Sequence, residues 1–269
     1  MSYRTIIFSK DENIGIIRLN RPERMNAVIE EMYLEIQDVL ESCMEDGSLR
    51  AIVLTGSVLK KNNTEKQAFC AGADLKEHAE GKRTIDDKRN YILLAHETTR
   101  RIYEFPKPVI AAINGPARGA GVEMAMNCDF IYIAEEATLA FPEIGLGTFV
   151  GGGVTQHLQR IIGLSRAKDL IFSGRVIGGM ETVEIGLALK CFPVSTLFEE
   201  AVKFAKSLAE KAPISMSMAK KYIHESAFIS LENVLNNETD AILSCMETED
   251  WQEGINAFGE KRKPLYKGK

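Results

Sequence analysis

Residues Ile113–Glu143 read INGPARGAGVEMAMNCDFIYIAEEATLAFPE, and this stretch decides both the fold class and the candidate site. Gly119 and Gly121 flank Ala120, and the VEMAMN run after them predicts a short apolar helix whose first backbone N–H groups have no partner within it. A helix start carries partial positive charge, and glycines let a ligand approach the backbone closely. The pattern therefore predicts a site near Ala120 that stabilises an oxygen anion.

Two isolated carboxylates accompany this anion site. Glu123 lies one turn into the predicted helix among apolar residues, and Glu143 follows Pro142 after a strand-like run. By residue type alone, Glu123 is an exposed helical glutamate and Glu143 a loop residue, because glutamate is rarely buried unpaired. The alternative is that the pair serves as acid and base beside the anion site.

Composition and charge limit the class of protein. The 269-residue chain is 45% hydrophobic and 26% charged, which is typical of one large globular domain or a core with an appendage. Its net charge of −5 argues against nucleic acid as the main partner, because phosphate binding needs a concentrated basic face. No window approaches roughly 18 uncharged apolar residues, and the amino terminus lacks a signal-peptide pattern. We therefore expect a cytoplasmic protein without a membrane partner.

The five cysteines are dispersed without a CxxC pair, and the four histidines are dispersed as well. This pattern favours reduced thiols over a disulfide framework or a zinc site. Cys70 and Cys128 are expected to be small core residues, because buried thiols are common. His96 and His157 are expected to be structural or surface residues.

Strand and helix signals alternate through the first half of the chain, which indicates an α/β fold. The predicted elements are a hairpin of strands Arg4–Ser9 and Ile14–Leu19, a helix Val28–Met44, a strand Ala51–Thr55, a polar loop at 56–67, a helix Asp87–Phe105 and a strand Val109–Ile113. From residue 163 onward the pattern is largely helical. The predicted helices there end at Gly174, near Leu189, and at Lys211 before Pro213.

A second glycine motif precedes another helix start. The segment FCAGADLKE places Ala73 just after Gly72, much as ARGAG places Ala120. Together the two motifs could direct one backbone N–H each, from Ala73 and Ala120, at a single carbonyl oxygen, which is the arrangement that acyl chemistry needs. The alternative interpretation is that both are helix-capping turns that allow close packing.

Several motifs, in this order, resemble the crotonase superfamily and, within it, the enoyl-CoA hydratases. They are LNRPERMNA, FCAGADLKE, KPVIAAINGPARGAGVEMAMNCD, PEIGLG, GGGVTQHL and INAFGEKRKP, and they span nearly the whole chain. The resemblance implies a spiral of ββα units at 1–195 that holds CoA and the active site. It implies a helical region at 196–269 that builds trimers, commonly paired into hexamers. It also places a CoA thioester carbonyl between the N–H groups of Ala73 and Ala120.

The hydratases of this family carry two catalytic glutamates, and the matching positions are Glu123 and Glu143. Polarisation of the thioester carbonyl makes the conjugated double bond electrophilic at Cβ, while negative charge collects on the oxygen. By resemblance, Glu123 mainly activates water and Glu143 delivers a proton to Cα, with the water shared between them. The expected reaction needs no metal and no cofactor, because CoA is part of the substrate.

The resemblance also implies which residues bind the CoA portion of the substrate. Arg24 and Met25 are expected along the CoA, and Phe258 and Lys261 are expected to reach it, often from a neighbouring subunit. The other expected contacts are Ala71, Gly72, Asp74 and Leu75 beside adenine and pantetheine, and Gly119 and Gly121 around the anion site. The alternative for the EKRKPLYKGK tail is a solvated basic end.

Two features depart from the usual family pattern. The run GTFVGGGVTQ places Phe149 and Val150 in a loop next to Glu143, and the loop GSVLKKNNTEKQ before Phe69 is longer than usual, on the CoA side. The variable segment His78–Tyr91 is expected to line the acyl pocket. These features leave the acyl preference, the pathway, the reaction direction and the choice of trimer or hexamer open.

Three functions follow from the sequence, in order of preference. The first is reversible hydration of a 2-enoyl-CoA to the 3-hydroxyacyl-CoA, by an oligomeric lyase of fatty-acid β-oxidation type. The second keeps the fold and the CoA thioester but isomerises a double bond or hydrolyses the thioester. The third is a non-catalytic scaffold or an RNA-binding relative, which the acidic net charge and the two intact glutamates disfavour. A dinucleotide site is not expected, because GLGTFVGGG misses the GxGxxG spacing.

Overall fold

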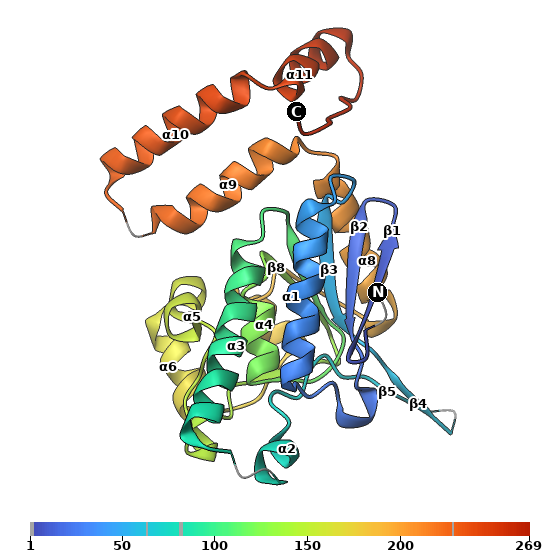
Figure 1. Ribbon diagram of the computed structural model, residues 1–269, viewed down its shortest axis with the longest axis vertical. Coiled ribbons are helices and arrows are strands. Elements are labelled where there is room, and N and C mark those ends of the chain that lie inside the picture. Colours follow the sequence, from blue (N-terminus) through green and yellow to red (C-terminus); the bar gives the residue numbers. More distant parts are fainter. Residues whose placement is uncertain (1–2, 63, 81–82, 228) are drawn as a thin grey trace.

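Six strands form the central sheet, in the order β1-β2-β3-β6-β8-β11. The computed structural model (Figure 1) describes residues 3–62, 64–80, 83–227 and 229–269. β1 and β2 pair antiparallel as the predicted hairpin, and each later pair of neighbours is parallel. The strands are β1 Ile6–Asp11, β2 Ile14–Leu19, β3 Ala51–Gly56, β6 Val109–Ile113, β8 Phe130–Ala134 and β11 Lys190–Phe192. The predicted α/β class is confirmed.

Helices cover both faces of this sheet, which explains why its central strands are apolar throughout. Every residue of β3 and β6 is buried, as expected for parallel strands packed on both sides. α8 (Val194–Ala209) packs against β3, β6 and β8, while α1 (Glu30–Glu45) packs against β1, β2 and α3 (Ile85–Glu104). In Figure 1, α1 and α3 lie in front of the sheet and α8 lies behind it.

A second, smaller sheet positions the candidate site. Its order is β10-β9-β7, in which β7 (Ala117–Arg118) is parallel to β9 (Thr138–Ala140) and β10 (Ile177–Gly178) is antiparallel to β9. α4 (Ala120–Met126) begins just after β7, and Glu143 follows β9. Because β7 and β9 are parallel neighbours, the residues that follow them leave the sheet at the same edge. This topology brings Glu143 to the start of α4.

The segment 56–67, predicted to be a polar loop, instead forms an antiparallel hairpin. Its strands are β4 (Leu59–Lys61) and β5 (Thr64–Lys66), and the hairpin projects from the body of the molecule (Figure 1). Asn62 has a left-handed φ of 49°, which asparagine tolerates better than most residues in a tight turn. Residue 63 lies outside the described residues. The loop prediction was wrong because the turn signal of the paired asparagines was not recognised.

The helix predicted to end near Leu189 is shorter than expected. It forms α7 (Gly179–Glu184), because Gly186 adopts a left-handed φ of 82° and the chain then enters β11. The helix end predicted at Gly174 is confirmed, since α6 stops there with a left-handed glycine. The remaining short elements are η1 (Pro22–Arg24), α2 (Leu75–Glu80), η2 (Ile144–Leu146), α5 (Val154–Ile162) and α6 (Leu164–Ser173).

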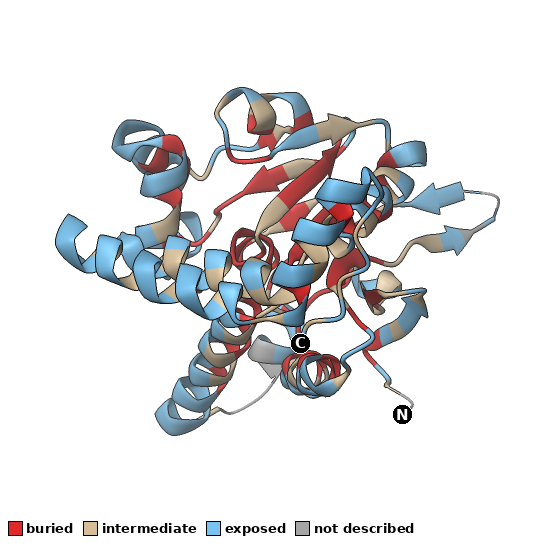
Figure 2. Cartoon of the chain, turned by 90° about the horizontal axis from the view of Figure 1, so that it is seen from above, coloured by how far each residue is buried: buried red, intermediate tan, exposed pale blue. Residues whose placement is uncertain are grey.

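The last three helices extend away from the central sheet (Figure 1) and are α9 (Pro213–Ser226), α10 (Leu231–Met246) and α11 (Glu249–Glu260). Pro213 stands in the first turn of α9, where its missing N–H costs nothing. No residue of α9 or α10, all of which the structure describes, is buried, and Figure 2 shows long outlying helices in pale blue and tan. An ion pair between Lys220 Nζ and Asp129 Oδ2, at 2.8 Å, anchors α9 to the core.

The boundary expected at residue 195 separates the sheet from these outlying helices only approximately. α8 begins beside the boundary and covers the sheet, whereas α9 to α11 leave it, so the division into 1–195 and 196–269 stays a prediction. Within the described ranges, no helix is both long enough and apolar enough to span a membrane.

Candidate active site

The two glycine motifs lie side by side in the folded chain. Cys70 and Ala117 form a parallel bridge, and the Arg118 N–H donates to Cys70 O at 2.9 Å. Gly72 has a left-handed φ of 91°, and a Cβ there would lie 2.9 Å from Arg118 O and 3.7 Å from Ala120 N. The backbone around Gly72 therefore runs closely against the start of α4, at a distance that only a residue without a side chain allows.

The Ala73 and Ala120 amides are both unpaired. The Val28 N–H donates to Gly72 O at 2.8 Å, and the Asp74 N–H donates to Val28 O at 3.0 Å. Successive peptide groups of an extended chain point in opposite directions, so the Ala73 N–H points away from Val28. Ala120 is the first residue of α4, so its N–H has no partner within the helix. Among the described residues, neither N–H donates a hydrogen bond to another protein group.

Glu123 is buried, contrary to the expectation for a lone helical glutamate, with 8% of the residue exposed. Its Oε1 accepts a hydrogen bond from the Gly151 N–H at 2.7 Å. The loop that supplies this donor packs directly on the side chain, since a Cβ on Gly152 would lie 2.8 Å from Glu123 Cβ. Glycine in this loop is what allows it to close over the carboxylate.

Glu143 is also buried, with 7% exposed, and lies against the start of α4. A Cβ on Gly119, whose φ is 46°, would lie 2.6 Å from Glu143 Oε1, so glycine is required there to make room for the carboxylate. Glu143 Oε2 is buried and has no hydrogen-bond partner among the described residues. A buried polar atom without a partner is costly and is typical of a functional site.

Burial raises the pKa of both carboxyl groups. The pKa of Glu123 rises from 4.5 to about 7 because the group has lost solvent; the Gly151 N–H opposes this rise and the nearby Glu143 adds to it. Burial likewise raises the pKa of Glu143. Each of the two carboxyl groups therefore keeps its proton to a higher pH than an exposed glutamate does. The pair is therefore suited to acid–base chemistry.

All four predicted catalytic residues line a single cavity of about 320 Å³. They are Ala73, Ala120, Glu123 and Glu143. Four of the predicted substrate contacts line it as well, namely Ala71, Gly72, Leu75 and Gly119. The cavity therefore combines two hydrogen-bond donors, two buried carboxyl groups and an otherwise largely apolar wall.

Three of the predicted substrate contacts lie behind the cavity lining and support it, namely Arg24, Asp74 and Gly121. Asp74 is 5% exposed and accepts a hydrogen bond from Arg21 Nη2 at 3.0 Å, with Arg24 Nε at 3.9 Å from the same carboxylate. Gly121 fits against Cys70, since a Cβ on it would lie 2.5 Å from Cys70 O. Asp74 thus joins the segment around residues 21–24 to the start of α2, and Gly121 allows α4 to approach the first glycine motif.

The other predicted CoA contacts lie apart from the described cavity lining. The Met25 carbonyl accepts a hydrogen bond from the Ala71 N–H at 3.0 Å, so the backbone of Met25 braces the first glycine motif. Phe258 is 89% exposed on α11, and Lys261 ends that helix with a left-handed φ of 55°. In Figure 1, α11 lies at the opposite end of the molecule from α2, whose first residue lines the cavity. Contacts from Phe258 and Lys261 to CoA therefore stay predictions that require a neighbouring subunit.

Sequence reasoning missed part of the cavity wall. Tyr33 from α1 packs edge-on against Tyr91 from α3, with ring centroids 5.8 Å apart. Ala95 follows Tyr91 by one helical turn on the same face, a spacing that could have identified the wall. The further lining residues that were not predicted are Ile92, His96, Arg118, Pro142, Leu146, Thr148 and Gly151.

The segment expected to line the acyl pocket contributes at its end. Tyr91 lines the cavity, while residues 81 and 82 of the segment His78–Tyr91 lie outside the described residues. Phe149 is 68% exposed and Val150 is buried, and neither is among the described lining residues. The loop that carries them nevertheless stays close to the site, because the Thr148 N–H donates to Glu143 O at 2.9 Å.

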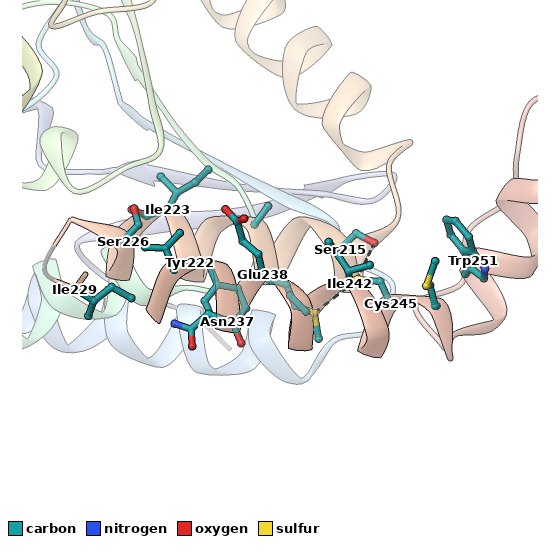
Figure 3. Close-up of a pocket in the computed structure, with 15 residues that line it drawn as sticks. Ser215, Tyr222, Ile223, Ser226, Ile229, Asn237, Glu238, Ile242, Cys245 and Trp251 are labelled. Carbon is teal, nitrogen blue, oxygen red and sulfur yellow. Dashed lines mark hydrogen bonds between the residues drawn. The ribbon is translucent and has the colours of Figure 1, made fainter. Parts of the chain in front are cut away.

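A larger pocket, of about 530 Å³, lies between α9 and α10 (Figure 3). Ile223 and Ile242 are 70% and 57% exposed there, although both are large and apolar. Other apolar side chains that line it are Met218, Val234, Met246 and Trp251. A mostly apolar exposed surface of this kind is typical of a site that packs against another protein.

Comparison with known proteins shows the family and the fold. The sequence model of the family described as enoyl-CoA hydratase/isomerase matches residues 9–269. The chain is 38% identical over 262 residues to a probable mitochondrial enoyl-CoA hydratase of Dictyostelium discoideum, covering 97% of this chain and 90% of that protein. It is 35% identical over 263 residues to a crotonyl-CoA hydratase of Syntrophomonas wolfei, covering 98% of each. The crystal structure of an enoyl-CoA hydratase from Bacillus anthracis superposes with a TM-score of 0.92 at 37% identity, covering 99% of this chain and 100% of that one.

The fold and the cavity thus define an α/β enzyme of the crotonase fold, as the sequence motifs predicted. The chain belongs to the enoyl-CoA hydratase/isomerase family.

Proposed function

We propose that the protein catalyses the reversible syn addition of water to a 2-enoyl-CoA, giving the 3-hydroxyacyl-CoA, and is therefore a hydro-lyase. The observation that carries this proposal is the meeting of two unpaired amides and two buried carboxyl groups in one cavity. The family includes isomerases as well as hydratases, and the names of the relatives favour hydration.

The two amides would bind the thioester oxygen. Addition of water at Cβ moves negative charge onto that oxygen as an enolate forms, and donors fixed in advance stabilise such charge without reorganisation. Ala73 and Ala120 suit this role because their N–H groups have no other partner among the described residues. The partial positive charge at the start of α4 adds to the effect.

The two glutamates would exchange protons with the same water molecule. Glu123 accepts a proton as water attacks Cβ, and Glu143 donates a proton to Cα from its acid form. The raised pKa values of both groups support acid–base exchange at this site, because each group holds a proton more readily than an exposed carboxyl group does. The division of roles between the two glutamates rests on the family resemblance. In the reverse direction the two roles exchange. The proposal requires no metal and no cofactor beyond the CoA of the substrate.

We further propose that the protein is a homotrimer, or a hexamer made of two trimers. The apolar pocket between α9 and α10 supports this, because a second copy of the chain would cover side chains that one subunit leaves exposed. A neighbouring subunit could also bring Phe258 and Lys261 to the CoA. Fatty-acid β-oxidation as the pathway and a cytoplasmic location stay predictions from the sequence.

The test is turnover of crotonyl-CoA and of a panel of linear, cyclic and aromatic enoyl-CoAs. Turnover is measured as the loss of the double bond conjugated to the thioester. Glu143→Ala should lower the hydration rate by on the order of a hundredfold or more, because it removes a proton-transfer group. A near-normal rate in this variant would defeat the role proposed for Glu143. Mass spectrometry of the products separates hydration from its two rivals, because isomerisation leaves the mass unchanged and thioester hydrolysis releases free CoA.

A further inference from the structure

Asn127 is a buried polar residue beside the active site but outside its lining. It follows the last turn of α4, is 4% exposed and is absent from the described residues that line the cavity. Its Nδ2 donates to Glu123 O at 2.8 Å and to Gly152 O at 2.7 Å. One side-chain amide thus joins the helix that carries Glu123 to the glycine loop that covers it.

The glycine loop, residues 151–153, needs such a tether. Gly152 and Gly153 have left-handed φ values of 56° and 78°. Glycine loses more conformational freedom on folding than any other residue, and ordering a residue costs roughly 1–2 kcal/mol. The loop is therefore intrinsically mobile unless hydrogen bonds fix it, and the bond from Asn127 to Gly152 O ties its centre to α4.

The loop in turn holds the Glu123 carboxylate. The bond from the Gly151 N–H to Oε1, at 2.7 Å, is the only hydrogen bond that this carboxylate accepts among the described residues. A Cβ on Gly152 would meet Glu123 Cβ at 2.8 Å, so the loop and the side chain are also in close packing contact. Displacement of the loop would leave the carboxylate without the donor that orients it.

We propose that Asn127 is a positioning residue for the hydration reaction. By tying Gly152 to α4, Asn127 presents the Gly151 N–H to Glu123 and fixes the carboxylate that activates water. This inference rests on the proposed function. Asn127 does not border the space for substrate and acts only through the loop, so its loss should affect the reaction step more than the binding of the CoA thioester.

The experiment compares Asn127→Leu and Asn127→Ser with wild type and with a matched control, Asn114→Leu. Asn114 is another buried asparagine, 8% exposed, whose Nδ2 bridges Gly56 O at 3.1 Å and Gln67 Oε1 at 3.0 Å. Asn127→Leu removes two hydrogen bonds, and Asn114→Leu removes three, since Asn114 Oδ1 also accepts from the Gly56 N–H at 3.1 Å. Both leucine variants should therefore lower Tm. Asn127→Ser introduces no added bulk and keeps a small hydroxyl donor, so it serves if the leucine variant does not fold.

Asn127→Leu should lower kcat for hydration by on the order of tenfold to a hundredfold, since small misplacements of a reacting group are costly. KM should change little, and the acid limb of the pH–rate profile should move to higher pH because the ionised Glu123 loses a hydrogen-bond donor. The other charged or titratable groups among the described residues that line the cavity are Glu143, His96, Arg118, Tyr33 and Tyr91, and all are unaltered. Asn114→Leu should leave kcat and the pH profile in place.

The inference is overturned if both Asn127 variants keep the wild-type kcat and acid limb while Tm falls as in Asn114→Leu, because Asn127 would then be a structural cap alone. A second readout needs no turnover: carbon-13 NMR of the carboxyl groups, with Glu123→Gln for assignment, gives the Glu123 pKa directly. If wild type shows no hydration, the proposed function fails, whereas an unchanged Glu123 pKa in the Asn127 variants contradicts the positioning role by itself.

Discussion

The carboxyl groups of Glu123 and Glu143 are both buried, and neither has a cationic partner among the described residues. Isolated buried carboxyl groups favour the neutral form, and this is the cause of their raised pKa values. Burial of these carboxyl groups lowers folding stability but makes them suited to proton transfer. Such a loss of stability is common where activity requires a destabilised group. The pH dependence of folding stability therefore tests the raised pKa of Glu123 without any substrate.

We predict that Glu123 makes folding stability fall as pH rises from about 4.5 to about 7. A carboxyl group whose pKa is higher in the folded state binds its proton more tightly there, so its contribution is most favourable below the unfolded pKa and is lost through the folded pKa. Glu123→Gln removes this dependence and keeps an acceptor for the Gly151 N–H. The free energy of unfolding of the variant should therefore exceed that of wild type increasingly across this window, by up to roughly 3 kcal/mol.

Urea denaturation of both proteins at fixed concentration, between about pH 5 and about pH 8, measures this difference. A difference that stays constant across the window would mean that the Glu123 pKa is not raised by folding. A difference that grows in favour of wild type would mean that the carboxylate is stabilised in the folded protein, contrary to its burial.

The two glutamates could be identified from the sequence, but their environment could not. Both stand out as lone carboxylates near a glycine motif, and the family resemblance assigns them roles. Residue type alone predicts exposure. Burial of Glu123 depends on Gly151 and Gly152, which are close to Glu123 only in the folded chain. No local sequence pattern therefore predicts this burial. Tyr33 was missed for the same reason, since it reaches the cavity from α1.

At the scale of elements, the site depends on how closely the start of α4 approaches the segment around Cys70. Gly121 is the point of closest approach, where an added Cβ would lie 2.5 Å from Cys70 O and 2.7 Å from Cys70 Cβ. Backbone contacts of this kind cannot yield by a change of side-chain rotamer. The absence of a side chain at position 121 therefore allows the start of α4, which carries Ala120, to pack against Cys70.

We predict that Gly121→Ala pushes α4 away from Cys70 and separates the two amides. The variant should lose stability by about 1–3 kcal/mol, as overpacked sites do, and kcat/KM should fall more than the change in stability explains. Steady-state kinetics below the Tm of the variant, together with its thermal unfolding, gives both quantities.

Gly145→Ala is the matched control, because a Cβ there meets no described atom within 4 Å and Gly145 is not in the left-handed region. Both measurements should be near wild type in this control. If Gly121→Ala folds stably and retains full kcat/KM, the spacing of the amides does not govern the reaction, and the oxyanion role of Ala73 and Ala120 would be contradicted.

Elements with a regular apolar period could be predicted from the sequence, and elements defined by a single turn could not. The helices α1, α3 and α8 and the strands β2, β3 and β6 match their predicted positions within a few residues, because each presents a repeated apolar face or a short β-branched run. The β4–β5 hairpin and the early end of α7 each depend on one left-handed residue, Asn62 and Gly186. A polar or mixed segment has no apolar periodicity from which the position of such a turn could be predicted.

For the molecule as a whole, the exposed apolar pocket between α9 and α10 is the proposed interface between subunits. We predict that Ile242→Asp disrupts the proposed homotrimer, because Ile242 is 57% exposed in the pocket and a carboxylate would be buried without a cation at the interface. Light scattering after size-exclusion chromatography at micromolar concentration should show trimer or hexamer for wild type and a smaller species for the variant.

Leu34→Asp is a suitable control, since Leu34 is similarly exposed, at 55%, but lies on α1 away from the pocket. A monomeric wild type would remove the oligomer proposal. An Ile242→Asp variant of wild-type size would show that the pocket between α9 and α10 is not the interface.

The central claim is that solvent water is added across the double bond of an enoyl-CoA. The most direct measurement is incubation of the wild-type protein with crotonyl-CoA in water enriched in oxygen-18, followed by mass spectrometry of the CoA thioester product. We predict 3-hydroxybutyryl-CoA with one oxygen-18 atom on Cβ, and no such product from a Glu123→Gln, Glu143→Gln double variant. An unlabelled isomer, or free CoA with a labelled carboxylic acid, would contradict it.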